Sequence, residues 1–187
     1  MPESKFNSQK HHRHSIRLPN YDYAQPGAYF ITIVTYQRTL LFGNIVNEEM
    51  QLNNFGKIVD ECWRAIPDHF PNVELRAYII MPNHIHGIIM INDHGATMSS
   101  SSSVGARHAS PLPHGVKSHS IGAIVGSFKS TVTRRIGREF NSTGIWQRNY
   151  YEHIIRNEKD LQNKTNYIEA NPMLWNVDNE NPFNIEL

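Results

Sequence analysis

The sequence lacks a second cysteine, a long apolar run and, over its first residues, the apolar segment typical of a secretory signal. Cys62 is the only cysteine among 187 residues, so no internal disulfide and no cysteine-rich zinc module can form. No apolar run approaches the roughly 20 residues of a membrane span. The first residues are polar and basic, without the apolar core of a secretory signal. These absences predict a globular protein of the reducing cytoplasm, without a membrane partner.

Length and composition predict one domain. The 39% hydrophobic content is that of a globular chain with a proper core. We expect the domain to span residues 21–175, with a flexible basic arm at 1–20 and a tail at 176–187. Residues 93–120 contain five consecutive serines and no apolar period, and this pattern predicts a flexible insertion.

Charge is unevenly distributed although the net charge is only +1. Between residues 115 and 150, six side chains are basic and Glu139 alone is acidic, and the balance becomes acidic after Tyr150. Such asymmetry suits a surface that binds a polyanion, although charged stretches are commonly just solvated faces.

Strands and helices interleave in the predicted order. Dense β-branched and aromatic residues predict strands at 29–36, 73–80, 84–91 and about 149–155, while 45–52 predicts a hairpin or a strand edge. Apolar positions at 3-4 spacing predict helices from Asn53–Asn54 to about His69, over 121–140, and from Asn157 to Pro172. Pro67 should end or kink the last turn of the first helix. The Met-Pro-Asn connection at 81–83 is too short for a parallel crossover. The fold class predicted is α+β, a mostly antiparallel sheet with helices packed on it, like a ferredoxin-type sandwich.

The sequence MPNHIHGIIMI at 81–91 carries the first candidate site. In a strand, His84 and His86 project from one face about 7 Å apart along the chain. Two imidazoles at that spacing are able to bind one divalent ion. The alternative is that both histidines lie on a solvated strand face, while Ile85, Ile89 and Ile91 form the core.

The last predicted helix carries the second candidate. At about 100° per residue, Leu161, Ile168 and Trp175 form an apolar stripe. Tyr167 lies on a polar face instead, together with Asp160, Lys164 and Asn171. Asn171 follows Tyr167 by four residues, so its amide shares a face with the phenol. The alternative is a tyrosine at the edge of the stripe with its hydroxyl in water.

Three motifs, HIH after MPN, then WQRNYYEHIIRNEKDL, then YIEANP, occur in this order. Together they resemble the REP-associated tyrosine transposases of the single-tyrosine HUH nuclease superfamily, over about residues 16–175 except the Ser-rich insertion. The resemblance implies that His84 and His86 hold a catalytic divalent metal, expected to be Mg²⁺ or Mn²⁺. It implies that Tyr167 attacks a phosphodiester of single-stranded, hairpin-bearing DNA and forms a 5′-phosphotyrosine. Asn171 falls where insertion-sequence relatives carry a glutamine ligand, and it is the predicted third ligand.

The partner implied is single-stranded or hairpin DNA, with no small-molecule cofactor and with a homodimer possible. Candidate DNA-binding side chains are basic or polar and lie near the predicted second and third helices: Lys129, Arg134, Arg135, Arg138, Gln147, Arg148 and Lys164. Trp146 would either stack on an unpaired base or lie in the core, and the core is favoured. His153 alternates with Tyr151 and Ile155 and is a further candidate for the site. The other histidines lie in predicted flexible segments and are expected to be solvated.

Two other functions fit the same residues. A metal-dependent hydrolase would use the histidines to activate water, with Tyr167 structural. A catalytically idle module derived from a transposase would only bind DNA hairpins. The intact set of His84, His86 and Tyr167 argues against the idle module.

Overall fold

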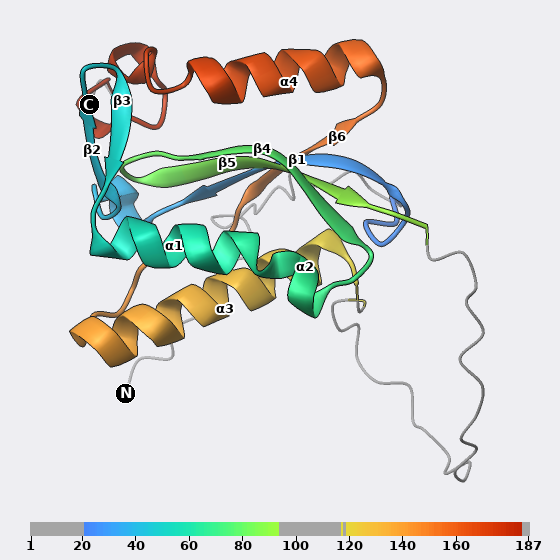
Figure 1. Cartoon of the computed structure of the whole chain (residues 1–187), viewed down its shortest axis with the longest axis horizontal. Helices are drawn as coiled ribbons and strands as arrows, with labels where there is room; N and C mark the ends of the chain where they lie inside the picture. Colours follow the sequence, from blue (N-terminus) through green and yellow to red (C-terminus); the bar gives the residue numbers. More distant parts are fainter. Residues whose placement is uncertain (1–20, 94–116, 118, 185–187) are drawn as a thin grey trace, which may run out of the picture.

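The structure is a computed structural model that describes residues 21–93, 117 and 119–184. Figure 1 shows the elements in space. The strands are β1 (Gly27–Val34), β2 (Gly43–Val46), β3 (Glu49–Leu52), β4 (Val73–Ile80), β5 (His84–Ile91) and β6 (Tyr151–Ile155). The helices are α1 (Asn54–Arg64), α2 (Ile66–His69), α3 (Ile121–Phe140) and α4 (Glu158–Ala170), with short 3₁₀ turns η1 (Tyr36–Arg38), η2 (Trp175–Val177) and η3 (Pro182–Asn184).

Four strands form the main sheet in the order β4-β5-β1-β6. Every neighbouring pair is antiparallel. The helical crossovers run from the first strand through α1 to β4 and from β5 through α3 to β6. This is the arrangement of a ferredoxin-type sandwich, so the predicted α+β class is confirmed.

The remaining two strands form a separate hairpin. Strands β2 and β3 pair through a turn at Asn47 and Glu48, which both have positive φ, 51° and 63°. Two positive φ values at the centre of a two-residue turn match the twist of the flanking strands. Of the two readings predicted for residues 45–52, the hairpin is the one observed.

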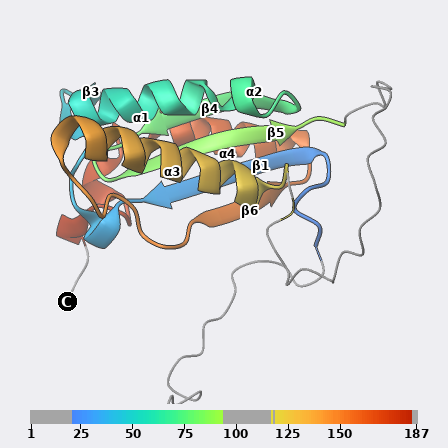
Figure 2. The same ribbon diagram turned by 90° about the horizontal axis from the view of Figure 1, so that it is seen from below.

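Helices cover both faces of the sheet (Figures 1 and 2). Helices α1 and α3 lie against one face, where the larger hydrophobic core forms. Helix α4 lies on the other face, over β4 and β5. A smaller cluster of Phe30, Ile88, Ile155 and Ile168 attaches it there.

Strand β5 is buried on both faces, and its alternation decides which residues line each one. Ile85, Ile89 and Ile91 join the core under α1 and α3. Gly87 lies in the same row, where the indole of Trp63 occupies the space that a Cβ would need. His84, His86 and Ile88 project to the opposite face, under α4. One face of β5 therefore packs in the larger core, and the other face directs both imidazoles toward α4.

The first predicted helix is interrupted near its end. Helix α1 ends at Arg64 and α2 begins at Ile66, with Ala65 between them at φ −81° and ψ −1°. Pro67 has no N–H, and its ring would clash with the carbonyl four residues earlier. The predicted kink is confirmed.

The last helix is shorter than predicted. It ends at Ala170, with Asn171 as its C-cap, so Trp175 belongs to η2 and not to the helix. Its N-cap is Asn157, as predicted, and the side-chain oxygen of Asn157 accepts a hydrogen bond from the backbone N–H of Asp160. The carboxylate of Asp160 reaches His153 Nε2 at 2.8 Å.

The predicted arm at 1–20 lies outside the described residues, as does most of the predicted insertion at 93–120. The chain is described again just before α3, where Lys117 pairs with Asp22 at 2.8 Å and Ser120 caps the helix. Within the described ranges, no helix is both long and apolar enough to cross a bilayer.

Candidate metal and nucleophile site

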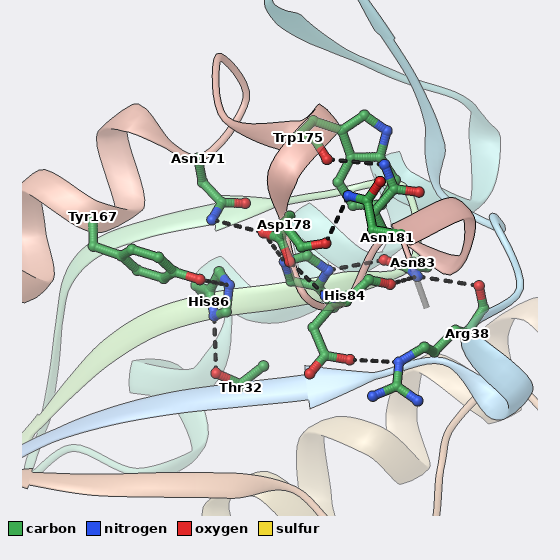
Figure 3. Close-up of polar contacts among 12 residues, drawn as sticks. Thr32, Arg38, Asn83, His84, His86, Tyr167, Asn171, Trp175, Asp178 and Asn181 are labelled. Atoms are coloured by element: carbon green, nitrogen blue, oxygen red, sulfur yellow. Dashed lines mark hydrogen bonds and ion pairs between the residues drawn. The ribbon is translucent and has the colours of Figure 1, made fainter. Parts of the chain in front are cut away.

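The two histidines of β5 lie side by side under α4 (Figure 3). Their ring centroids are 4.4 Å apart, and the side chains are 0% and 3% exposed. Strands β4 and β1 flank β5 on either side, so the backbone that carries both rings is held at the centre of the sheet. The alternative of a solvated strand face is therefore not what the structure shows.

Asn83 determines which nitrogen of His84 carries the proton. The Asn83 amide nitrogen donates to the backbone carbonyls of Arg38 and Glu180, at 3.1 and 2.7 Å. Its oxygen is therefore the atom that faces His84 Nδ1, at 2.8 Å, and Nδ1 must be the donor. The lone pair of His84 is thereby left on Nε2, which is buried without a hydrogen-bond partner in the described structure. An unpaired buried acceptor is costly unless a ligand uses it.

Burial keeps His84 neutral. It lowers the pKa of His84 to about 4, against an opposing effect of the nearby Asp178 carboxylate. The contact between His84 Nε2 and Asp178 Oδ2 at 4.0 Å is therefore not an ion pair at neutral pH. A neutral imidazole is the form that binds metals.

His86 is held by its neighbours on β1. Its Nδ1 is 2.9 Å from the Thr32 hydroxyl, and its ring stacks on Phe30 at 5.3 Å with an interplanar angle of 22°. Burial lowers the pKa of His86 well below the ordinary value, and electrostatic repulsion from His84 and from the Lys164 ammonium lowers it further. The Nε2 of this ring is directed at Tyr167.

Tyr167 extends from α4 to the histidine strand. Its hydroxyl is 3.3 Å from His86 Nε2, so the predicted tyrosine and histidine meet. The side chain is 40% exposed, which leaves the phenol accessible from solvent. Burial of its inner part raises the pKa of Tyr167, and the negative charge of Asp178 raises it further. The free chain thus holds a neutral phenol.

Asp178 is the acidic member of the site, and it was not among the predicted site residues. Its carboxylate lies with the ligand nitrogens of His84 and His86 in a group whose atoms are all within 4.8 Å of one another. It belongs to residues 176–184, predicted as a tail, which instead fold over the site through η2 and η3. The available signal was a run of Asn, Asp and Glu after Trp175, without any helical or strand period.

Asn171 links the carboxylate to the other site residues. Its amide nitrogen donates to Asp178 Oδ2 at 3.1 Å, and its oxygen is buried without a partner among the described residues. Two unpaired acceptors, Asn171 Oδ1 and His84 Nε2, therefore lie buried in the same site. Imidazole, carboxylate and amide groups together form a donor set that suits a divalent ion.

A strained turn holds the segment that carries Asp178. Gln37 and Arg38 both have positive φ, 53° and 54°, a conformation that costs about 1 kcal/mol or more for each non-glycine residue. This turn directs the Arg38 guanidinium to Glu180 at 2.9 Å and the Arg38 carbonyl to Asn83. Asn83 consequently contacts the turn, the Asp178 segment and His84 at once (Figure 3).

The predicted DNA-binding side chains lie in three places. Lys129, Arg134, Gln147 and Arg148 line an open pocket of about 550 Å³ between α3 and the segment before β6. The Lys129 ammonium donates to the carbonyls of residues 147, 148 and 149, and burial lowers its pKa to about 8. The Lys129 ammonium is thus held by backbone carbonyls in the wall of the pocket, whereas the side chains of Arg134 and Arg148 are exposed to solvent.

The other candidates lie elsewhere. Arg135 pairs with Glu61 of α1 at 2.7 Å, while Arg138 is exposed near the end of α3. Lys164 lies on α4 with its ammonium 4.9 Å from the centre of the Phe30 ring, close to His86 and Tyr167. Trp146 packs against Phe42 and Phe128 and belongs to the core side, as favoured.

His153 is paired away from the metal group. Its Nε2 binds Asp160 at 2.8 Å and so joins β6 to the first turn of α4. His153 lies on the site face of the sheet, since it pairs with Phe30 of β1. It supports the helix that carries Tyr167 and is not part of the group formed by His84, His86 and Asp178.

No family model matches the chain. An uncharacterized protein of Haemophilus influenzae is 44% identical over 175 residues, which cover 94% of this chain and 96% of the relative. A second protein of that organism, named as a candidate REP-associated tyrosine transposase, is 27% identical over 83% of this chain and 77% of its own length. A solved REP-associated tyrosine transposase bound to a REP hairpin has a TM-score of 0.57 and 20% identity, covering 84% of this chain and 73% of that one.

The structure brings together a buried His-x-His strand and a tyrosine from a following helix, the arrangement that the resemblance to the single-tyrosine HUH class implies. The 44% identity shows that this chain and the uncharacterized Haemophilus protein belong to one family. The second relative and the shared fold agree with the ordered motifs, and the chain is a relative of the REP-associated tyrosine transposases.

Proposed function

We propose that the chain cuts and rejoins single-stranded, hairpin-bearing DNA through Tyr167, in the manner of a transposase. One observation carries the proposal: the Tyr167 hydroxyl lies 3.3 Å from His86 Nε2, beside the buried and unpaired His84 Nε2 and Asn171 Oδ1. A nucleophile and a group of metal-ligand atoms thus converge from elements some eighty residues apart in sequence. The similarity to proteins named as transposases supports the coarser statement that the chain acts on DNA.

His84, His86 and Asp178 would hold a divalent metal, and Asn171 is the candidate for a fourth ligand. This proposal keeps the predicted pair, adds a carboxylate, and gives Asn171 a second role in orienting Asp178. A mixed nitrogen and oxygen set suits Mn²⁺, and Mg²⁺ is favoured by the oxygens. When bound, the ion would polarise the scissile phosphate, and its charge would oppose the carboxylate charge that raises the pKa of Tyr167.

The reaction of this chain's own residues is a transesterification. The Tyr167 oxygen attacks phosphorus, so that an Oη–P bond forms while the P–O3′ bond breaks. The phenolic proton leaves to solvent, to which Tyr167 is 40% exposed, and the departing 3′ oxygen takes a proton from water. The products are a 5′-phosphotyrosine and a 3′-hydroxyl. Because the ester energy is retained, the reverse attack by a 3′-hydroxyl rejoins a strand.

The DNA would contact basic side chains in two places, one on α4 beside Tyr167 and one beside α3. Lys164, one turn before Tyr167 on α4, is the candidate to hold a phosphate at the site. Arg134, Arg148 and Gln147 of the pocket beside α3, with Arg138 further along that helix, are the candidates for the hairpin backbone. One solved structural relative is described as bound to a REP hairpin, and we infer a hairpin substrate of this kind.

The test incubates the purified chain with a hairpin oligonucleotide that has single-stranded flanks, in Mn²⁺ or Mg²⁺. We expect a protein–DNA adduct that survives denaturant and is absent from Tyr167→Phe. Cleavage at full rate by Tyr167→Phe, without an adduct but dependent on His84, would establish the hydrolase instead. Salt-dependent binding without cleavage by the intact chain would establish the idle binding module.

A further inference from the structure

Tyr151 stands in one row with the metal-ligand histidine. It is the first residue of β6, the edge strand, and it pairs with Thr32 of β1. Thr32 in turn pairs with His86 of β5 and hydrogen-bonds to its ring. Directly paired residues on neighbouring strands project to the same face. With strands about 4.8 Å apart, the backbones of Tyr151 and His86 are separated by about 10 Å across the sheet.

The outer end of this row is accessible. Tyr151 is 48% exposed, whereas Thr32 and His86 are almost completely buried. Apart from its first turn, where Asp160 binds His153 of β6, helix α4 packs mainly over β4 and β5. Within the part of the chain that the structure describes, the Tyr151 ring has neither a hydrogen-bond partner nor an aromatic neighbour. A large flat ring that is about half exposed is thus presented beside the site.

We propose that Tyr151 is a stacking platform for an unpaired base adjacent to the phosphate that lies at Tyr167 and His86. The ligand is a nucleotide of a single strand, and the inference rests on the proposed function because that function supplies the substrate. Every base has a π face, so an aromatic ring holds a strand without selecting its sequence. The Lys164 ammonium lies across the row on α4, where it can neutralise the phosphate of the same strand. Tyr151 and Lys164 therefore bracket the path by which a strand reaches the nucleophile.

The experiment uses the full chain with Tyr167→Phe, which cannot form the covalent ester. The probe is a DNA hairpin with single-stranded oligothymidine flanks, in which 5-iodouracil replaces individual thymines. Long-wavelength irradiation should crosslink the flank to the peptide that contains Tyr151, as mass spectrometry would show. Affinity is measured by fluorescence anisotropy. Tyr151→Leu should bind the probe about tenfold more weakly, while Tyr151→Phe should stay within about twofold.

The matched control is Phe140→Leu, an exposed aromatic side chain at the end of α3 on the other face of the sheet. It should leave both affinity and the crosslink unchanged. Circular dichroism and thermal melts verify that each variant is folded. Equal affinities of Tyr151→Leu and Tyr151→Phe, or a crosslink confined to other peptides, would overturn the stacking proposal.

The outcomes separate this proposal from the proposed function. If the chain with Tyr167 forms no adduct but the crosslink maps to Tyr151, the stacking site stands and the covalent chemistry is wrong. If the adduct forms and Tyr151→Leu binds as well as the parent, the stacking site alone is wrong. If the chain does not bind the probe at all, both are wrong.

Discussion

Replacing Asp178 with Asn should separate metal binding from folding. The exchange preserves shape, and the side-chain oxygen can still accept the hydrogen bond from the Glu180 backbone, which is 2.6 Å in the present structure. The new amide would face the Asn171 amide nitrogen, but a half-turn of Asn171 presents its unpaired oxygen instead. We therefore expect the metal-free stability to change by no more than about 1 kcal/mol.

The metal-dependent part of the stability should respond differently. An ion present at 100 times its Kd stabilises the folded chain by about 2.7 kcal/mol. If loss of the carboxylate weakens binding about 100-fold, the upper range for removing even an outer partner of a metal ligand, that gain falls to about 0.4 kcal/mol. The difference of about 2.3 kcal/mol corresponds to roughly 5–9 °C in Tm for a chain of this size.

The assay is thermal unfolding in EDTA and in Mn²⁺, for the parent chain and for Asp178→Asn. Asp68→Asn, an exposed carboxylate on α2, serves as the control and should keep the full Mn²⁺ shift. A full shift in Asp178→Asn, together with its loss in Asn171→Ala, would refute the reasoning and make Asn171 the ligand.

Three further predictions concern folding. Asn157→Ala should destabilise the chain by about 1 kcal/mol in chemical denaturation because α4 loses its N-cap, while Asn163→Ala in the exposed middle of α4 should be neutral or stabilising. Gly87→Ala should cost about 1–3 kcal/mol, since its methyl group would meet the Trp63 indole, and a melt within 1 °C of the parent would contradict the packing. Below pH 6.5 the unfolded state binds a proton at His84, whereas the folded state, in which the pKa of His84 is about 4, does not. The free energy of unfolding should therefore fall by about 3 kcal/mol from pH 6.5 to 4, and by less in His84→Gln.

The sequence predicted what depends on local periodicity. Strand alternation placed His84 and His86 on one face, and helical spacing placed Tyr167 away from the apolar stripe toward them. Chain order and the short Met-Pro-Asn connection were sufficient for the α+β class and for the antiparallel pair. These features follow from rules that apply within a few residues.

What could not be predicted depends on contacts between distant segments. Asp178 lies in an aperiodic segment whose position is determined by Asn83 and by the Arg38–Glu180 pair, both far away in sequence. Lys129 was predicted to contact DNA, yet its ammonium donates hydrogen bonds to three backbone carbonyls of the segment before β6. Neither partner set leaves a local sequence signature.

The late position of Asp178 has a genetic consequence. All six strands and all four α-helices of the described structure are encoded before the codon for residue 178. A frameshift or stop codon just upstream would therefore spare the sheet, the histidines and the tyrosine, and would remove the carboxylate of Asp178 together with the Glu180 contacts to Asn83 and Arg38. On the proposed function, such an allele would produce a chain that still occupies DNA without cutting it, and its product would compete with intact copies for the same sites.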